Sequence, residues 1–289
     1  MPESVAELID LLKLDQVDQA AFIGRDDDSP DRVVQRVFGG QVLAQALIAA
    51  YHTVADDRVA HSLGAYFLRA GLPGQPIRYQ VEVARDGGSF STRRVVAVQA
   101  DREIFSMVAS FHADEPGLTH SDLPPTGVPA PPDCPPLSDV LGARSQRAVA
   151  AWRREWGVLD VRFASDTSTL TKSGLRDAAM KVWVKAESDL PGDARIHQAV
   201  LAYASDLTLL GVSTVPHPVE FGGPGMQVAS IDHSMWFHRP VRADRWLLYD
   251  QVSPSASAGL GFSFGRMFAG PTLAASCAQE GLIRMLDRS

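Results

Sequence analysis

Apolar residues in the first part of the chain follow a helical pattern and then an alternating one. Ser4 and Glu7 form a capping-box pattern ahead of a short apolar segment, which predicts a helix near the N-terminus. A longer apolar run at 37–52 carries a glycine pair near its start and predicts a second helix. Alternating positions then predict strands near 60–69, 77–85, 89–99 and 103–112.

The same order of elements is predicted again further along the chain. A helix is expected at 196–211. Strands are expected near 161–166 and 180–186 before this helix, and near 226–238, 245–252, 257–268 and 272–284 after it. Val42-Leu43-Ala44 recurs as Val200-Leu201-Ala202, and His61-Ser62 recurs as His233-Ser234. An apolar helix wrapped by a curved antiparallel sheet is the hot-dog arrangement, so two copies predict an α+β double hot-dog fold.

A proline-rich segment separates the two copies. Eight of the 19 prolines lie between residues 114 and 136, and proline neither continues a helix nor donates a hydrogen bond within a sheet. A helix is expected after it, at about 138–156. We therefore predict an N-terminal hot-dog unit over 1–115, a linker over 116–137, and a connecting helix with the C-terminal hot-dog unit over 138–289.

Charge and cysteine content narrow the class of protein. The net charge of −7 argues against a nucleic-acid-binding protein, because binding to phosphates needs a basic surface. Cys134 and Cys277 lie in dissimilar contexts, so no disulfide framework is expected. The N-terminal segment is acidic, and no apolar run approaches the ~18 residues that a membrane span requires. We therefore expect a cytoplasmic protein without a signal peptide or a membrane span.

Six segments give the chain a specific resemblance. They are VFGGQVLAQAL (37–47), AYFLRAG (65–71), RDGGSFSTRRV (85–95), LAYASDLTLL (201–210), IDHSMWFHRP (231–240) and CAQEGLIR (277–284). Together they resemble the type II acyl-CoA thioesterases, the TesB-type double hot-dog enzymes, over nearly the whole chain apart from the linker. The resemblance implies hydrolysis of acyl-CoA thioesters, expected to be of medium to long chain, to free fatty acid and coenzyme A. It implies no cofactor, no metal and no covalent intermediate.

The resemblance also implies a catalytic Asp, Thr and Gln that orient and activate water. These positions are occupied by Asp206, Ser230 and Gln279. Serine at the threonine position keeps the hydroxyl but loses the β-methyl group that restricts its rotation. Asp206 interrupts an apolar helical run, as a catalytic carboxylate would, and a solvated helix face is the structural alternative. Strand alternation places Gln279 on one face with Ala275 and Cys277, and an exposed position on an edge strand is its alternative.

The repeat indicates a single active site in each chain. The counterpart of Gln279 in the first copy is Phe111, an apolar residue. We therefore expect the second copy to supply most of the site. Because sheets of hot-dog proteins commonly associate, we also expect a homo-oligomer.

Five residues of the first copy are candidates for substrate binding. Gly39 and Gly40 could present N–H groups to a carbonyl oxygen or a phosphate, or could serve only close packing. Arg93 and Arg94 could pair with the phosphates of coenzyme A, or could lie at a solvated strand end. His61 is a candidate base, with a satisfied core histidine as the structural alternative.

Three other functions fit the sequence less well. The segment GFSFG at 261–265 matches the nucleophile elbow of serine hydrolases, but Gly270-Pro271 leaves no room for the elbow helix and no histidine follows Ser263. A double hot-dog enoyl-CoA hydratase has a G-D-x-N-P core, whereas this chain contains no asparagine. A non-catalytic acyl-CoA-binding protein on the same fold is favoured only by Ser230.

A metal site is not expected from the histidines. His233 and His238 lie five residues apart in a predicted strand, and strand alternation places them on opposite faces.

Overall fold

The first half of the chain forms elements close to the predicted ranges. Over the whole chain, the computed structural model describes residues 2–26, 36–142, 149, 156–164, 177–223 and 225–286. The described elements of the first half are α1 (Val5–Leu12), β1 (Asp15–Asp18), β2 (Ala21–Gly24), α2 (Gly39–Tyr51), β3 (Arg58–Phe67), β4 (Ile77–Asp86), β5 (Phe90–Gln99) and β6 (Arg102–Ala113). The predicted capping box is confirmed, because the Ser4 side chain accepts a hydrogen bond from the Glu7 N–H at the start of α1.

The second half repeats a central helix and an antiparallel sheet. The segment before it contains the 3-10 helix η1 (Pro131–Asp133) and α3 (Leu137–Gly142). The described elements that follow are β7 (Leu159–Phe163), β8 (Ala179–Ala186), α5 (Ala194–Ser205), the 3-10 helix η3 (Leu210–Thr214), β9 (Met226–Ser230), β10 (Asp232–Phe237), β11 (Leu247–Ser257), β12 (Leu260–Ala269) and β13 (Thr272–Met285).

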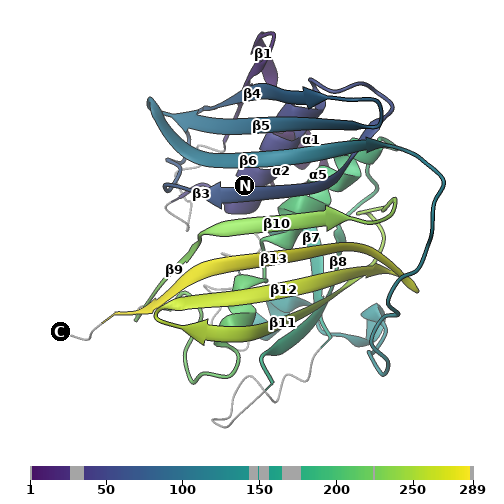
Figure 1. Ribbon diagram of the computed structural model, residues 1–289. Helices are drawn as coiled ribbons and strands as arrows, with labels where there is room; N and C mark the ends of the chain where they lie inside the picture. The colour runs from purple at the N-terminus through teal and green to yellow at the C-terminus, as the bar shows by residue number, and fades with distance from the viewer. Residues whose placement is uncertain are drawn as a thin grey trace.

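Strands of the two halves join into one antiparallel sheet (Figure 1). Its order is β1-β2-β4-β5-β6-β3-β10-β13-β12-β11-β8-β7, and β9 pairs with β13 beside this path. The two halves meet where β3 pairs with β10, with Leu63 opposite Met235 and Ala65 opposite His233. Hydrogen bonds therefore run from one hot-dog unit into the other, and the predicted double hot-dog fold is confirmed.

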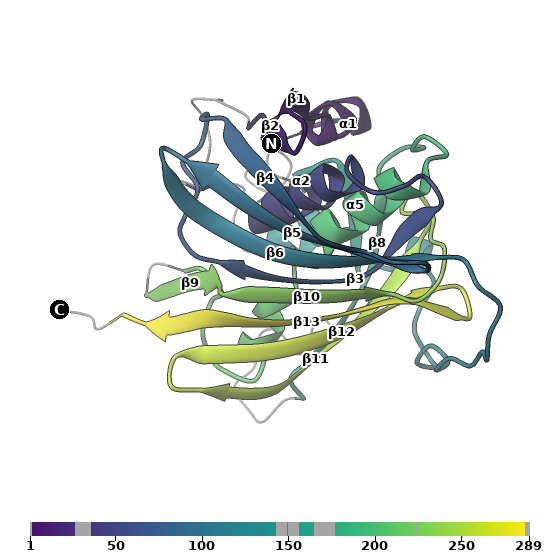
Figure 2. The same cartoon turned by 45° about the horizontal axis from the view of Figure 1, so that its top comes forward.

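The two central helices lie side by side against one face of the sheet (Figure 2). In α2, every residue from Gly40 to Tyr51 is buried, and in α5 every residue from His197 to Ser205 is buried. A helix that is apolar all round is stable only when it is covered on all sides. Here the sheet covers one side of each helix and the neighbouring helix covers another.

Some predicted boundaries are wrong. The helix expected at 196–211 ends at Ser205, where the chain turns and then forms η3. The strand expected at 226–238 is interrupted at Ile231, which separates β9 from β10. The β1–β2 hairpin was not predicted. Parts of the helix expected at 138–156 and of the strand expected at 161–166 lie outside the described residues.

Other predictions concern the chain as a whole. Cys134 and Cys277 are both buried free thiols, in agreement with the expected lack of a disulfide framework. No helix in the described part of the chain is long and apolar enough to cross a membrane. β6 ends at Ala113 and α3 begins at Leu137. The proposed division into units over 1–115 and 138–289 stays a prediction.

Candidate active site

Asp206 lies at the C-terminal end of α5, not inside a longer helix as the apolar pattern predicted. It is the C-cap residue, and its carboxylate is buried. Its Oδ1 atom accepts a hydrogen bond from the Ser230 hydroxyl at 3.0 Å and another from the Gln279 side-chain amide. The predicted residues of the second half therefore converge on one carboxylate oxygen.

Burial makes Asp206 a stronger base than an ordinary carboxylate. It raises the pKa of Asp206 to about 6, while hydrogen bonds from Gln279, Ser230 and the Gly40 N–H and the charge of Arg36 act in the opposite direction. A base is most useful when its pKa lies near the pH at which it works. Asp206 is thus ionised at neutral pH and can still accept a proton.

Gln279 is fully buried in β13, on the same face as the buried residues Ala275 and Cys277. This is the face that strand alternation predicts, and the alternative of an exposed edge position is wrong. Its amide nitrogen donates to Asp206, while its Oε1 atom is buried without a hydrogen-bond partner among the described residues. A buried acceptor is costly unless it is paired. This oxygen can therefore accept a hydrogen bond from a water molecule beside Asp206.

Ser230 is the last residue of β9 and pairs with Gly281 in β13. The chain leaves the regular strand at Ile231, so the hydroxyl of Ser230 comes from a strand end while Gln279 comes from a continuous neighbouring strand. Both side chains reach the end of α5 from the sheet.

The glycine pair of the first half completes the surroundings of Asp206. The start of α2 has no side-chain cap, and the Gly40 N–H donates to Asp206 instead. A Cβ atom on Gly39 would lie only 2.6 Å from Asp206 Oδ2, and one on Gly40 would collide with the Tyr203 carbonyl oxygen. The pair therefore allows close packing, and the Gly40 N–H is used by Asp206, so that the positive end of α2 faces the carboxylate. Donation from this pair to a carbonyl oxygen or phosphate of the substrate stays a prediction.

The site is thus built by both halves. Its three polar side chains come from the second half, and the first half contributes the start of a helix. That these residues form the active site stays a prediction.

The structure places the other candidates of the first half elsewhere. His61 is the extra residue of a bulge in β3, between Ala60 opposite Phe111 and Ser62 opposite Ser110. Its Nε2 atom lies 2.8 Å from Ser110 Oγ, and its ring packs against Phe90 and His112. None of these contacts involves Asp206, so the geometry does not favour His61 as the base, and its role in substrate binding stays a prediction.

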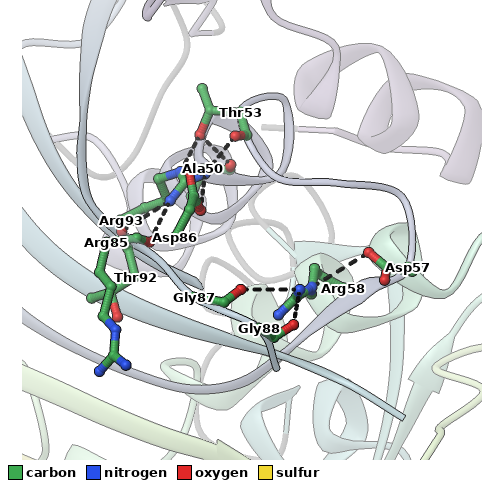
Figure 3. Close-up of polar contacts among 10 residues, drawn as sticks. All are labelled: Ala50, Thr53, Asp57, Arg58, Arg85, Asp86, Gly87, Gly88, Thr92 and Arg93. Atoms are coloured by element: carbon green, nitrogen blue, oxygen red, sulfur yellow. Dashed lines mark hydrogen bonds and ion pairs between the residues drawn. The ribbon is translucent and has the colours of Figure 1, made fainter. Parts of the chain in front are cut away.

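Arg93 is a buried structural cation and not a free phosphate-binding group (Figure 3). Its guanidinium donates to the Thr53 carbonyl oxygen at 2.7 Å and to the Thr53 hydroxyl at 2.9 Å. It also donates to the Arg85 carbonyl oxygen and pairs with Asp86 at 2.8 Å. Arg94, the next residue, is more than half exposed and lies 3.8 Å from Glu82. Of this arginine pair, only Arg94 has a guanidinium that a ligand in solvent could reach.

Two residues near Asp206 were not predicted. His233 is fully buried in β10, with Nδ1 at 4.0 Å from Asp206 Oδ1. The recurring His-Ser pair within IDHSMWFHRP was the signal that could have identified it. Arg36 donates to the Val228 carbonyl oxygen at 2.9 Å, and its charge lowers the pKa of Asp206. No sequence pattern marked Arg36.

Comparison with known proteins gives a consistent result over both halves. A family model described as acyl-CoA thioesterase matches residues 154–282, and one described as acyl-CoA thioesterase N-terminal domain matches residues 29–112. The chain is 38% identical to acyl-coenzyme A thioesterase 8 of Homo sapiens over 287 residues, which cover 95% of this chain and 88% of that protein. It is 37% identical to acyl-CoA thioesterase 2 of Haemophilus influenzae, over 99% of this chain and 100% of that protein.

A solved structure agrees in fold. The crystal structure of acyl-CoA thioesterase II TesB2 from Mycobacterium marinum has 40% sequence identity to this chain and a TM-score of 0.80. The match covers 96% of this chain and 98% of that one.

Proposed function

Because the chain belongs to the acyl-CoA thioesterase family and hydrolyses acyl-CoA thioesters, we propose that Asp206, Gln279 and Ser230 form its catalytic group. The observation that carries this proposal is the convergence of Gln279 and Ser230 on one oxygen of Asp206, a buried carboxylate with a pKa of about 6. A carboxylate held in this way is suited to removing a proton from water.

In the proposed reaction, Asp206 activates water directly. The water donates one hydrogen bond to Asp206 and another to Gln279 Oε1. As its oxygen attacks the thioester carbonyl carbon, its proton passes to Asp206. The tetrahedral intermediate then breaks its carbon–sulfur bond, and the departing sulfur of coenzyme A takes the proton from Asp206. The products are the free acid and coenzyme A, and the carboxylate is restored without a covalent enzyme intermediate.

Ser230 and Gln279 have distinct tasks in this scheme. The hydroxyl of Ser230 and the amide nitrogen of Gln279 hold the carboxylate in one orientation. The free Oε1 atom of Gln279 orients the water. A proton-accepting group contributes its full effect only when the reacting atoms are held in hydrogen-bond range.

We propose substrates of medium to long acyl chain, the class expected from the sequence. The test is the release of free thiol from a series running from acetyl-CoA to palmitoyl-CoA, with and without a chelator. Release should rise toward the longer chains and should not change with the chelator. No thiol release at any chain length, from folded protein, would contradict this substrate class and would favour binding or another reaction.

Binding without catalysis is the alternative function, and Ser230 was the only feature that favoured it. In the structure, the serine hydroxyl donates a hydrogen bond to Asp206, which the proposed reaction uses to orient the carboxylate. No other observation favours a binding protein. The homo-oligomer and the cytoplasmic location stay predictions.

A further inference from the structure

His233 occupies a buried position next to the proposed base, and the reaction described above does not use it. It lies in β10, opposite Ala65 of β3, and is 0% exposed. Its Nε2 atom lies 2.9 Å from the hydroxyl of Ser205, the residue that directly precedes Asp206. Its Nδ1 atom lies 4.0 Å from Asp206 Oδ1 and has no hydrogen-bond partner among the described residues.

The hydrogen bonds of Ser205 determine which nitrogen of His233 carries the proton. The Ser205 hydroxyl donates its single hydrogen to the Ala202 carbonyl oxygen at 2.8 Å. It can therefore only accept from His233, so Nε2 is the protonated nitrogen. Burial lowers the pKa of His233 to about 4, which keeps the ring neutral. The nitrogen that faces Asp206, Nδ1, consequently presents a lone pair and no hydrogen.

The lone pair of His233 Nδ1 acts on the charge of Asp206 in the opposite direction to the other groups around this carboxylate. Ser230, Gln279 and Gly40 all donate hydrogen bonds to the carboxylate and so favour its charged form. Arg36 acts in the same direction through its charge. An unprotonated nitrogen close to the same oxygen in a buried site disfavours the negative charge. His233 thus opposes the donors that would make Asp206 a weak base.

We propose that His233 is a positioning residue for the hydrolysis reaction. Held by Ser205 with its proton on Nε2, it turns the unprotonated Nδ1 toward Asp206 and strengthens this carboxylate as a base. The same hydrogen bond fixes the end of α5, from which Asp206 projects. This inference rests on the proposed role of Asp206.

Other titratable groups near this pair are held by their own contacts. The Tyr249 hydroxyl donates to the Ser205 carbonyl oxygen at 2.9 Å and lies 3.0 Å from the Cys277 sulfur. Burial raises the pKa of Tyr249 well above its ordinary value and that of Cys277 to about 12, so both are neutral over the working pH range. The charge that faces His233 in this range is that of Asp206, with Arg36 as the cation acting on Asp206.

Two substitutions separate the contacts of His233. His233→Gln keeps an amide nitrogen that can reach Ser205 but removes the nitrogen that faces Asp206. Ser205→Ala removes the acceptor for Nε2, so the ring proton can move to Nδ1 and donate to Asp206. Both changes should lower the pKa of Asp206 and weaken the base. We expect kcat to fall about 10-fold in each, part of the ~10²–10⁴-fold effect of a general base, with little change in KM.

The pH dependence of the rate distinguishes this role from a purely structural one. Activity of the parent enzyme should fall as the pH drops through the pKa of Asp206, because the base becomes protonated. In both variants this acidic limb should move to lower pH. His238→Gln is the matched control, since His238 directly follows β10 and its Nε2 atom lies 2.9 Å from Ser276 Oγ instead of contacting the site. It should leave kcat and the acidic limb unchanged.

The protonated nitrogen can also be observed without substrate. Proton–nitrogen NMR correlation of ¹⁵N-histidine-labelled protein, with the His233→Gln variant to assign the signal, should show a neutral ring protonated at Nε2. This readout does not depend on the catalytic roles proposed for Asp206, Ser230 and Gln279. A ring protonated at Nδ1 would overturn the inference. So would folded variants with lower thermal stability but with the parental kcat and acidic limb.

Discussion

The two halves of the chain use the same scaffold for different purposes. In the second half, Ser263 lies opposite Gln279, which binds Asp206. In the first half, Ser91 lies opposite Phe111, whose ring packs on Tyr51 with ring centroids 5.0 Å apart. The strand positions correspond, but one carries an amide that binds Asp206 and the other an aromatic ring that packs in the core. A repeated fold therefore does not imply a repeated active site.

A cross-strand ion pair shows what the halves have kept in common. Arg94 lies opposite Glu82 in the first half, and Arg266 lies opposite Asp250 in the second. The second pair is shorter, at 2.7 Å compared with 3.8 Å. Both ion pairs join corresponding strands, β4 and β5 in the first half and β11 and β12 in the second. The two sheets therefore keep this ion pair although the buried residues of the two halves have diverged.

The residue before each of these arginines shows the divergence. Arg93 is buried and donates to Thr53, just beyond the end of α2. Gly265 takes its place in the second half, and the ring of Tyr249 fills the space that a Cβ atom would need. Tyr249 donates to the Ser205 carbonyl oxygen at the end of α5. Each sheet thus holds the end of its own helix, and the second half places the buried carboxylate of Asp206 there.

The largest expected effect is the loss of this carboxylate. Asp206→Ala should lower kcat by ~10²–10⁴-fold, because the water then has no base. Ile48→Val, at the corresponding position of α2 in the Val-Leu-Ala repeat, should leave kcat unchanged. Thiol release by folded protein of both variants is the measurement. Near-parental turnover of Asp206→Ala would show that another group is the base.

The contrast between Gln279 and Phe111 can be tested by making both positions leucine. Gln279→Leu removes the donor to Asp206 and the acceptor for water, and kcat should fall by ~10²–10³-fold, as for loss of one positioned hydrogen-bonding group. Phe111→Leu should leave kcat unchanged and cost about 1–3 kcal/mol of stability, because it removes buried ring atoms and leaves a small cavity. Thiol release and thermal unfolding of both variants separate these outcomes. Equal losses of kcat would mean that the halves share the catalytic task.

The contribution of Asp206 to stability should be smaller at neutral pH than at acidic pH. Its pKa is raised from 3.8 to about 6 in the folded state, so the folded protein binds this proton more tightly than the unfolded chain. Its contribution to stability is therefore lost as the pH rises through this interval, by about 3 kcal/mol for about two pKa units.

The substitution Asp206→Asn tests this linkage, because it removes the charge and keeps the shape. The variant should gain stability relative to the parent above about pH 7, and the gain should disappear below about pH 4. Thermal unfolding over this pH range is the measurement. A stability difference that does not change with pH would contradict the raised pKa.

A smaller effect is expected from the buried arginine of the first half. Arg93→Met should lower the free energy of unfolding by about 1–3 kcal/mol, because the Thr53 and Arg85 carbonyl oxygens lose a buried donor. It should not change kcat. Arg94→Met is the control, and at this exposed position its effect should be within about 0.5 kcal/mol. Denaturant unfolding measures both, and a loss of kcat in Arg93→Met would mean that the halves are coupled functionally.

Much of this architecture could be predicted from the sequence, because periodic burial is a local property. The helix at 37–52 and the strands that follow it were recognised from their apolar periods. The end of α5 was missed, because Leu209 and Leu210 continue the helical spacing after the chain has turned at Asp206. β1 was missed because all four of its residues are exposed, so it has no apolar alternation.

The candidate site was only partly predictable. Asp206, Ser230 and Gln279 came from the family resemblance, and from their residue types alone each had a structural alternative. The contact between Gly40 and Asp206 joins the two halves, and the approach of His233 depends on the packing of β10 beside α5. Neither periodicity nor motif spacing determines which side chains meet across such an interface.

The smallest expected change concerns Ser230. Ser230→Ala removes the hydrogen bond of 3.0 Å to Asp206 and should lower kcat about 10-fold, the effect of a single hydrogen bond to a charged group. Ser230→Thr keeps this hydroxyl and adds a methyl group that limits its rotation. Since Ser230 is only half-buried at the end of β9, the methyl group has room, and kcat should equal or exceed that of the parent. Ser230→Val has the shape of threonine without the hydroxyl and should resemble Ser230→Ala.

If the threonine and valine variants lose activity equally, the added methyl group is not tolerated. The comparison of these two variants then does not isolate the effect of the hydroxyl. If the alanine variant keeps the parental kcat, Gln279 alone orients the carboxylate. The polar group that distinguishes the second half from the first then consists of Asp206 with one essential hydrogen-bonding partner instead of two.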